Sequence, residues 1–250
     1  MQTSGAAASA APHRLHYFAG RGRAEQSRWV LAATETPFIN VVLKSAADFA
    51  SLDASGALLF GQVPLLQAPD GTRVVQSQAI VRHIAAAGGL LGATPAERTL
   101  ADQLAEGVAD FRSPLLSFPF GRDRSSCVGA VRRYAPVFEQ ALKAAPAGFV
   151  AGGASLTHAD VLLAEAVTGY TELLGDWAKD AFPLLAAHRD RVCALPGVLN
   201  ASCIEPAPRM ALMTCLHAGI AAYLASELRF PAPDGAVADA YVQNVRVVLS

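Results

Sequence analysis

The N-terminal third of the chain alternates short apolar runs with a segment of helical periodicity. Leu15–Phe18 and Phe38–Val42 are rich in aromatic and β-branched residues, which predicts two strands. Between them, residues 23–34 repeat their apolar positions at helical spacing, which predicts a helix. A strand, a helix and a second strand in this order predict a parallel pair joined by a right-handed crossover.

Two shorter apolar runs follow and predict a hairpin. Leu65–Gln67 and Val74–Val75 are separated by the turn sequence Pro69-Asp70-Gly71, so we expect an antiparallel pair. We expect Ser77 to cap the next helix, which would end at Gly88-Gly89. The resulting order, βαβ and then ββα, is that of the thioredoxin-like fold.

Beyond the break at residues 91–95, the pattern predicts helices and no strand before the C-terminal tail. Thr94 and Pro95 are a typical N-cap and first helical residue. Thr157 and Asp160 have the spacing of a capping box, which marks a further helix start. The expected helices cover about 95–117, 127–145, 157–171 and 183–193.

These elements predict two structural parts of the class α/β plus all-α. We expect a thioredoxin-like N-terminal domain over residues 14–92, followed by an all-helical C-terminal domain over residues 93–230. Residues 1–13 are Ala/Ser-rich and predict a disordered lead-in. Residues 231–250 begin with Pro-Ala-Pro-Asp-Gly and predict an appended tail.

Composition and charge exclude several classes of function. The 250-residue chain carries 20 basic and 21 acidic residues, a net charge of −1, which does not indicate a nucleic-acid-binding surface. Its four cysteines show neither a CxxC pair nor metal-ligand spacing, which is typical of a reducing compartment. Residues 1–13 lack the basic and apolar regions of a secretory signal. We therefore expect a cytoplasmic protein without a metal site.

One apolar segment raises the question of a membrane. Met210 to Ala225 is almost uncharged, but its length is at or below the roughly 18–20 residues that a transmembrane helix needs. A helix packed over a hydrophobic pocket is the simpler interpretation, so membrane association is not expected. A tail-anchored form is the alternative.

Tyr17, at the C-terminal end of the first predicted strand, is the first candidate for chemistry. A phenol in this position can hydrogen-bond a thiol sulfur, and donation to the thiolate lowers the pKa of the thiol. A free thiol with a pKa of about 8.5 is only a few per cent ionised at pH 7. Arg23, at the following helix start, would favour the same anion. Taken alone, Tyr17 also fits a half-buried strand residue, and Arg23 a solvated one.

Two further elements could hold an anionic peptide. In Gln62-Val63-Pro64, a cis bond before the proline would turn the Val63 N–H and C=O outward to pair with an extended ligand. Gln76 precedes Ser77, which offers a hydroxyl and free N–H groups at a helix N-terminus, and these suit a carboxylate. Lys44 could meet another carboxylate. Each of these features is also consistent with an ordinary turn, cap or surface residue.

In this order and at this spacing, the segments resemble the glutathione S-transferases, and within them the alpha class. The similarity covers roughly residues 14–209. Its most specific pieces are Leu15-His16-Tyr17-Phe18, Arg21-Gly22-Arg23, Trp29, Gln62-Val63-Pro64 and Gln76-Ser77. The helical part adds Glu106-Gly107-Val108-Ala109-Asp110, Arg133-Tyr134 and Thr157-His158-Ala159-Asp160. The ordered set carries the resemblance, rather than any single piece.

The resemblance implies how glutathione would be bound. Tyr17 would be the catalytic residue that hydrogen-bonds the glutathione sulfur, with Arg23 assisting. The peptide-binding positions would be Gln62 and Val63 at the cysteinyl portion, Gln76 and Ser77 at the γ-glutamyl carboxylate, and Lys44 near the glycyl carboxylate. No cofactor beyond the co-substrate glutathione is implied.

The resemblance also implies a homodimer and a hydrophobic-substrate site. Asp110 and Arg133 would reach the site of the neighbouring subunit. Phe60 matches the aromatic residue that such dimers insert into a pocket on the partner. The wall facing the hydrophobic electrophile would include Phe18, Gly20, Leu116 and Phe120.

The chain departs from the alpha-class pattern at several positions. Asp53 stands where the class usually has an arginine directed at the glycyl carboxylate, so an acid there should weaken glutathione binding unless Lys44 compensates. Gln78 replaces a basic residue of the dimer interface. The segment Met210–Phe230 is longer and more apolar than the helix that closes the family's substrate site.

The leading functional hypothesis is therefore a glutathione transferase, in which the bound thiolate attacks an electrophilic carbon of a hydrophobic substrate. A glutathione-dependent isomerase or peroxidase would use the same thiolate and is an alternative. A non-catalytic carrier of hydrophobic ligands is a third hypothesis. Asp53 argues mildly for the carrier, whereas Tyr17 and Arg23 argue against a decayed site.

Overall fold

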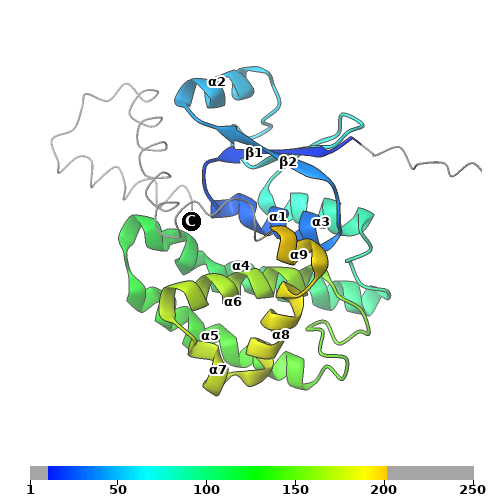
Figure 1. Cartoon of the computed structure of the whole chain (residues 1–250), viewed down its shortest axis with the longest axis vertical. Helices are drawn as coiled ribbons and strands as arrows, with labels where there is room; N and C mark the ends of the chain where they lie inside the picture. Colours follow the sequence, from blue (N-terminus) through cyan, green and yellow to red (C-terminus); the bar gives the residue numbers. More distant parts are fainter. Residues whose placement is uncertain (1–10, 202–250) are drawn as a thin grey trace, which may run out of the picture.

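A mixed sheet of four strands forms the N-terminal part of the structure (Figure 1). The computed structural model describes residues 11–201. Its strands are β1 (His13–Phe18), β2 (Phe38–Leu43), β3 (Leu65–Gln67) and β4 (Arg73–Val75). They lie in the order β2-β1-β3-β4, with β1 parallel to β2 and the other pairs antiparallel. The predicted parallel pair and the predicted hairpin are both confirmed.

Three helices accompany this sheet. A short 3₁₀ turn, η1 (Gly22–Ala24), leads into α1 (Glu25–Ala33), and α3 (Ser77–Ala87) follows β4. Figure 1 shows α1 and α3 on the sheet face turned toward the helical part, and α2 (Ala46–Ala54) on the opposite face. The sequence analysis did not predict α2, although Ser45 and Asp48 form its capping box.

The start of α3 corrects one expectation from the sequence. Ser77 does not cap this helix, because it is the first helical residue, and Gln76 occupies the N-cap position. Gln76 has a φ of 73°, in the left-handed region that non-glycine residues enter at a cost of about 1–3 kcal/mol. No local sequence preference points to such a conformation at a glutamine, so the sequence favours a cap one residue later than the observed one.

The helical part consists of six described helices. They are α4 (Pro95–Gly121), α5 (Arg124–Lys143), α6 (His158–Leu174), α7 (Trp177–Ala181), α8 (Pro183–Cys193) and α9 (Pro196–Ala201). The four long helices match the predicted ones, and α7 and α9 are additions. Thr94 and Thr157 cap α4 and α6 as expected, each in a full capping box with an acid three residues later.

One continuous core joins the sheet to the helices. Val161 to Val167 in α6 include the most deeply buried run of the helical part, and α1 packs against both α6 and α9. Leu15 of β1 and Leu66 of β3 belong to the same hydrophobic cluster as Phe111 of α4. The sheet is therefore joined to the helical part through α1, because burial of this shared apolar surface stabilises the contact of α1 with α6 and α9.

Some sequence-based expectations concern residues outside the described range. The lead-in up to residue 10, the apolar segment Met210–Ala225 and the tail 231–250 all lie outside it. Within residues 11–201, no helix is both long and apolar enough to span a bilayer. The same residues contain no cluster of three or more side chains suited to binding a metal ion.

Candidate functional site

Tyr17 lies at the end of β1 with its side chain buried, 7% exposed. Its hydroxyl oxygen accepts a hydrogen bond of 3.0 Å from the backbone N–H of Arg23. Burial raises the pKa of Tyr17, while that hydrogen bond and the charges of Arg23, Arg112 and Arg28 oppose the rise. The phenol therefore keeps its proton at neutral pH. Since the contact with Arg23 uses the hydroxyl oxygen as an acceptor, the O–H remains a donor.

The turn after β1 packs directly on this phenol. Gly22 has a φ of +42°, and a Cβ added there would lie 2.5 Å from the Tyr17 hydroxyl oxygen. A side chain at this position would displace the tyrosine and strain the backbone, so the close approach requires glycine. Gly22, the middle residue of the Arg21-Gly22-Arg23 motif, therefore lets the turn pack against the candidate phenol.

Arg28 of α1 holds the same turn from the sheet side. Its guanidinium donates to the Gly20 carbonyl at 3.0 Å, to Glu25 at 2.8 Å and to Asn40 of β2 at 2.8 Å. Arg28 is itself buried. These bonds fix the path of the chain between Tyr17 and α1.

A buried ion pair in the helical part reaches the turn from the other side. Arg112 of α4 donates to the two carboxylate oxygens of Glu165 in α6, at 2.6 Å from Nε and 2.8 Å from Nη2. The same Nη2 donates to the Gly22 carbonyl at 2.9 Å. The side chains are only 5% and 7% exposed. Burial raises the pKa of Glu165, and the charge and hydrogen bonds of Arg112 oppose that rise.

Arg112 and Glu165 are not among the residues predicted from the sequence, although both carry a signal. Arg112 continues the buried stripe Ala101, Ala105 and Val108 along α4, and Glu165 lies within the wholly buried run of α6. A charged residue on the apolar stripe of a helix indicates a buried partner, because an unpaired buried charge is costly. The sequence does not indicate which partner, since the pair spans 53 positions.

The predicted peptide-binding residues lie at one end of the sheet, where β3 begins and β4 finishes. Gln76 donates from its side-chain amide to the Gln62 side chain at 3.1 Å, which brings these two candidates together. The Val63–Pro64 peptide bond is cis, the condition set by the sequence analysis. Ser77 is partly exposed at the first turn of α3.

The two charged candidates, Lys44 and Asp53, are both exposed. Lys44 follows β2, where its backbone N–H donates to Asp48, and its side chain points to solvent. Asp53 is near the end of α2, and its carboxylate lies 3.7 Å from where a Cβ on Gly61 would be. Its negative charge is therefore beside the loop that carries Gln62.

The four residues of the predicted hydrophobic wall come from two segments. Phe18 is half-buried and stacks on Phe49 of α2, with ring centroids 6.0 Å apart. Gly20 is buried, and its carbonyl is engaged by Arg28. Leu116 and Phe120 are partly exposed one turn apart on α4.

The predicted intersubunit residues are all exposed in the single chain. Asp110 lies on α4 and Arg133 on α5, where the Arg133 guanidinium is 5.1 Å from the centre of the Tyr134 ring. Phe60 is 61% exposed, next to Leu59 at 77%. An exposed aromatic–aliphatic pair on a loop is the kind of surface that a partner covers.

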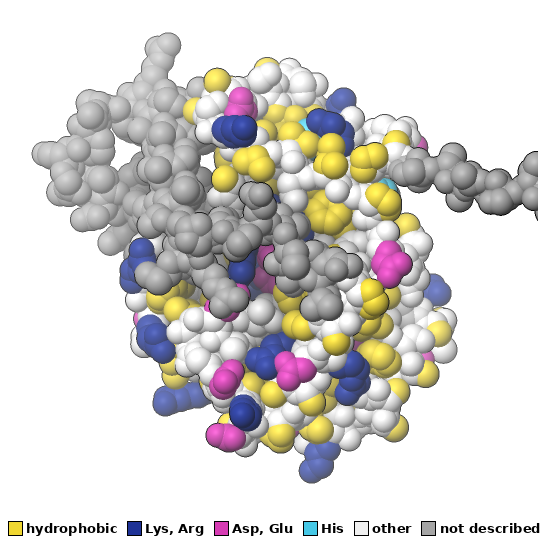
Figure 2. Space-filling model, viewed as in Figure 1, with side chains coloured by type: hydrophobic (Ala, Val, Ile, Leu, Met, Phe, Trp, Pro, Cys, Tyr) yellow, Lys and Arg dark blue, Asp and Glu magenta, His cyan; other side chains and the backbone are white. Residues whose placement is uncertain are grey.

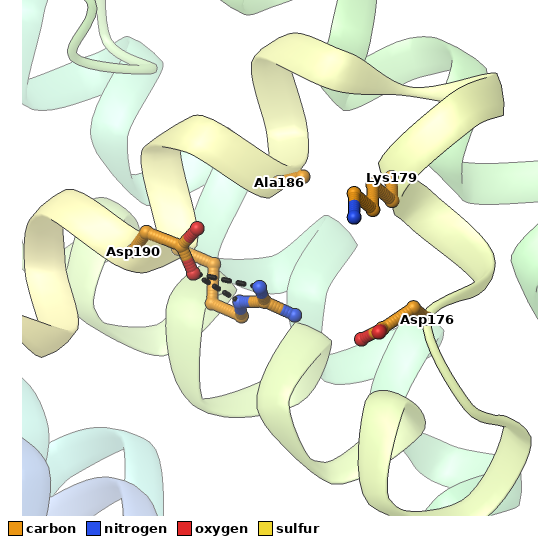
Figure 3. A pocket seen from close by; sticks show the side chains of 5 residues that line it. Asp176, Lys179, Ala186 and Asp190 are labelled. Carbon is orange, nitrogen blue, oxygen red and sulfur yellow. Dashed lines mark hydrogen bonds and ion pairs between the residues drawn. The ribbon is translucent and has the colours of Figure 1, made fainter.

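A separate pocket of about 230 Å³ lies in the helical part and contains none of these candidates (Figure 3). Its lining is Asp176, Lys179, Ala186, Arg189 and Asp190. Arg189 is held there by Asp190 and by Thr171 of α6. Charged side chains of both signs are also interspersed over the helical half of the face seen in Figure 2. Neither the pocket nor this surface therefore indicates a binding site for ligands of a single charge sign.

Comparisons with known proteins identify the class to which this fold and site belong. Residues 13–86 match the family model described as glutathione S-transferase, N-terminal domain, and residues 108–196 match that of the C-terminal domain. The chain is 40% identical to glutathione S-transferase alpha-5 of Rattus norvegicus over 191 residues, 74% of this chain and 85% of that protein. It is 36% identical to human glutathione S-transferase A3 over 192 residues, with the same coverage.

Solved structures agree with this assignment. The glutathione S-transferase of Ascaris lumbricoides superposes with a TM-score of 0.66 at 26% identity, over 76% of this chain and 95% of that one. The monomeric enzyme Na-GST-3 of Necator americanus gives 0.67 at 28% identity, also over 76% and 95%.

The chain therefore belongs to the glutathione S-transferase family, and its relatives include alpha-class enzymes. The predicted fold and the predicted transferase activity, glutathione conjugation, are confirmed. The isomerase, peroxidase and carrier alternatives are not favoured.

Proposed function

We propose that this transferase ionises bound glutathione with Tyr17 and directs the thiolate at a hydrophobic electrophile. The observation that supports this is the Tyr17 hydroxyl, which accepts the Arg23 N–H and keeps its own proton for the sulfur. Donation of that proton in a hydrogen bond favours the thiolate over the thiol. Arg23, at the same turn, adds a positive charge that favours the anion.

The peptide would bind across the end of the sheet at which β2 and β4 finish and β3 begins. Gln62 and the Val63 backbone would take the cysteinyl portion, and Gln76 with Ser77 the γ-glutamyl carboxylate. The contact of Gln62 with Gln76 supports a continuous surface for the two portions. Lys44 would take the glycyl carboxylate, against the charge of Asp53.

The electrophile would lie against Phe18, Gly20, Leu116 and Phe120, beside the sulfur. The thiolate attacks an electrophilic carbon, a carbon–sulfur bond forms, and the leaving group departs with its electron pair. The protein then contributes thiol ionisation and proximity of the two reactants, and no cofactor other than glutathione is required.

We further propose a cytoplasmic homodimer without membrane attachment. Exposed Phe60 would insert into the partner, and Asp110 and Arg133 would complete the neighbouring glutathione site. We retain the domain boundaries 14–92 and 93–230. Since one related structure is described as monomeric, the dimer is tested by sedimentation of the wild type and of Phe60→Ser, which we expect to be monomeric.

The decisive test of the function compares conjugation of glutathione to a chloronitrobenzene in the wild type and in Tyr17→Phe. Loss of a hydrogen bond to a thiolate should cost about 1.5–3 kcal/mol, or roughly 10–100-fold in rate at pH 7. The pH profile should move upward, because the thiol then ionises at higher pH. Tyr134→Phe, which keeps its ring against Phe111, is the matched control. A normal rate and profile in Tyr17→Phe would refute the proposed role.

A further inference from the structure

A single peptide group connects the buried Arg112–Glu165 pair to Tyr17, the proposed thiol activator. The carbonyl oxygen of Gly22 accepts from Arg112 Nη2 at 2.9 Å. The N–H of Arg23, which belongs to the same peptide group, donates to the Tyr17 hydroxyl at 3.0 Å. Because a peptide group is planar and rigid, holding its oxygen also sets the direction of its N–H.

We infer that Arg112 is a positioning residue for thiol activation, acting from the helical part of the molecule through the Gly22–Arg23 peptide group on Tyr17. The inference rests on the role proposed above for Tyr17. Glu165 holds the Arg112 guanidinium, Arg112 holds the Gly22 carbonyl, and the Arg23 N–H then holds the phenol. Because the Tyr17 hydroxyl oxygen accepts from Arg23, its O–H points away from Arg23, in the direction proposed for the glutathione sulfur.

Two physical effects follow from this chain of contacts. The first is geometric, because the bidentate Glu165 contact fixes the guanidinium plane and leaves Nη2 aimed at Gly22. The second is electronic, because a cation on the carbonyl polarises the peptide group and strengthens its N–H as a donor. A phenol that accepts a stronger hydrogen bond is itself a better donor to the sulfur.

The charged groups around Tyr17 agree with the role inferred for Arg112. Cations reach Tyr17 from three elements, Arg23 of η1, Arg28 of α1 and Arg112 of α4, and all three oppose the rise in the Tyr17 pKa that burial causes. The acids beside them are Glu165 and Glu25. Of the three cations, Arg112 comes from the helical part, so it links activation of the thiol to packing between the sheet and the helices.

The test must separate positioning from stability, since removing Arg112 alone would leave Glu165 buried without a partner. The double variant Arg112→Met/Glu165→Met replaces the pair by apolar side chains of similar volume, which is often neutral for stability. Arg112→Lys keeps the charge and loses the planar fork that serves both acceptors. Glu172→Gln is the matched control, because it removes the exposed Arg21–Glu172 pair that also joins this turn to α6.

We expect the double variant to move the pH profile of kcat/KM upward by about one unit, with a roughly tenfold loss at pH 7. The KM for glutathione should stay near that of the wild type. Arg112→Lys should show a smaller shift, and Glu172→Gln none. Circular dichroism and thermal melting test whether each variant is folded. If the double variant is unfolded, the pH profile of kcat/KM in Arg112→Lys tests the inference instead.

The same variants in a Tyr17→Phe background complete the test. If Arg112 acts through Tyr17, its replacement should cause no further shift once the hydroxyl is gone. A folded double variant with an unchanged profile would overturn the inference, and so would a shift of equal size in the Tyr17→Phe background. Tyr17→Phe with wild-type activity would instead refute the proposed function, which separates the two failures.

Discussion

The two ends of the candidate site are built in opposite ways. At the thiol end, Tyr17 and its supports Arg28, Arg112 and Glu165 are buried and joined by hydrogen bonds. At the peptide end, Lys44, Gln62 and Gln76 are exposed, and the candidates there are linked by one contact between two amides.

This difference follows from what each end must do. A group that changes the ionisation of a thiol has to keep its geometry while charge develops, and buried, fully bonded side chains do this without reorganisation. A surface that admits a charged peptide must remain open to solvent. We therefore expect substitutions at the thiol end to reduce the rate, and substitutions at the peptide end to change affinity by smaller factors.

The largest expected contrast comes from two glycines with similar backbone conformations. Gly22 has a φ of +42° and Gly61 a φ of +59°, so an alanine at either should cost about 1–2 kcal/mol of backbone strain. Gly22→Ala would also push its Cβ against the Tyr17 hydroxyl, and kcat/KM should fall roughly 10–100-fold, as when that hydrogen bond is lost. The measurement is kcat/KM with glutathione and a chloronitrobenzene.

Gly61→Ala is the control for this variant, because the nearest atom to its new Cβ would be an Asp53 oxygen at 3.7 Å, an ordinary contact. Its kcat/KM should change by less than about threefold. Equal losses of activity in the two variants would show that backbone strain, and not the position of Tyr17, controls the rate.

The sequence predicts those parts of this architecture that depend on residues close together along the chain. The strands and the four long helices follow from local apolar periodicity, and the caps Thr94 and Thr157 follow from spacings of three residues. The helix α2 is not predicted, although Ser45 and Asp48 give the same kind of signal. The reason is that the residues following this capping box show little helical periodicity.

Predictions about the site divide along the same line. Tyr17 is a candidate from the sequence because it belongs to a compact local motif. The contacts that position it, from Arg28 to Gly20 and from Arg112 to Gly22, join residues 8 and 90 positions apart. Such pairing is decided by packing of the shared core, so a single sequence indicates the buried charges and not their partners.

The second contrast concerns the strained residue at the peptide end. Gln76→Ala and Gln76→Gly both remove the amide that contacts Gln62, and each should weaken glutathione binding about 2–10-fold, the equivalent of one hydrogen bond. Only Gln76→Gly also relieves the φ of 73°, so it should be more stable than Gln76→Ala by about 1 kcal/mol. Urea unfolding and glutathione titration measure the two effects.

The alanine variant is the control for the loss of the side chain, since it keeps the strained backbone. If Gln76→Gly proved no more stable than Gln76→Ala, the positive φ would carry no energetic cost at this position. If neither variant weakened glutathione binding, Gln76 would have no role in holding the peptide, and the proposed binding surface would be wrong there.

The smallest expected effect is also the one of opposite sign. Asp53 places a negative charge beside the loop of Gln62, close to where the proposed glycyl carboxylate would lie. Because the residue is exposed, each pairing is worth only about 0.2–1 kcal/mol. Asp53→Arg should therefore tighten glutathione binding about 1.5–5-fold, and Asp53→Asn by less, with kcat unchanged.

Salt distinguishes this effect from a change of shape. At 1 M ionic strength the screening length is only about 3 Å, so the gain in Asp53→Arg measured at low salt should largely disappear. A gain that persisted at high salt would indicate a direct contact rather than a through-solvent charge effect. No gain at low salt, together with weaker binding in Lys44→Gln, would mean that Lys44 already holds the carboxylate and that Asp53 lies outside its reach.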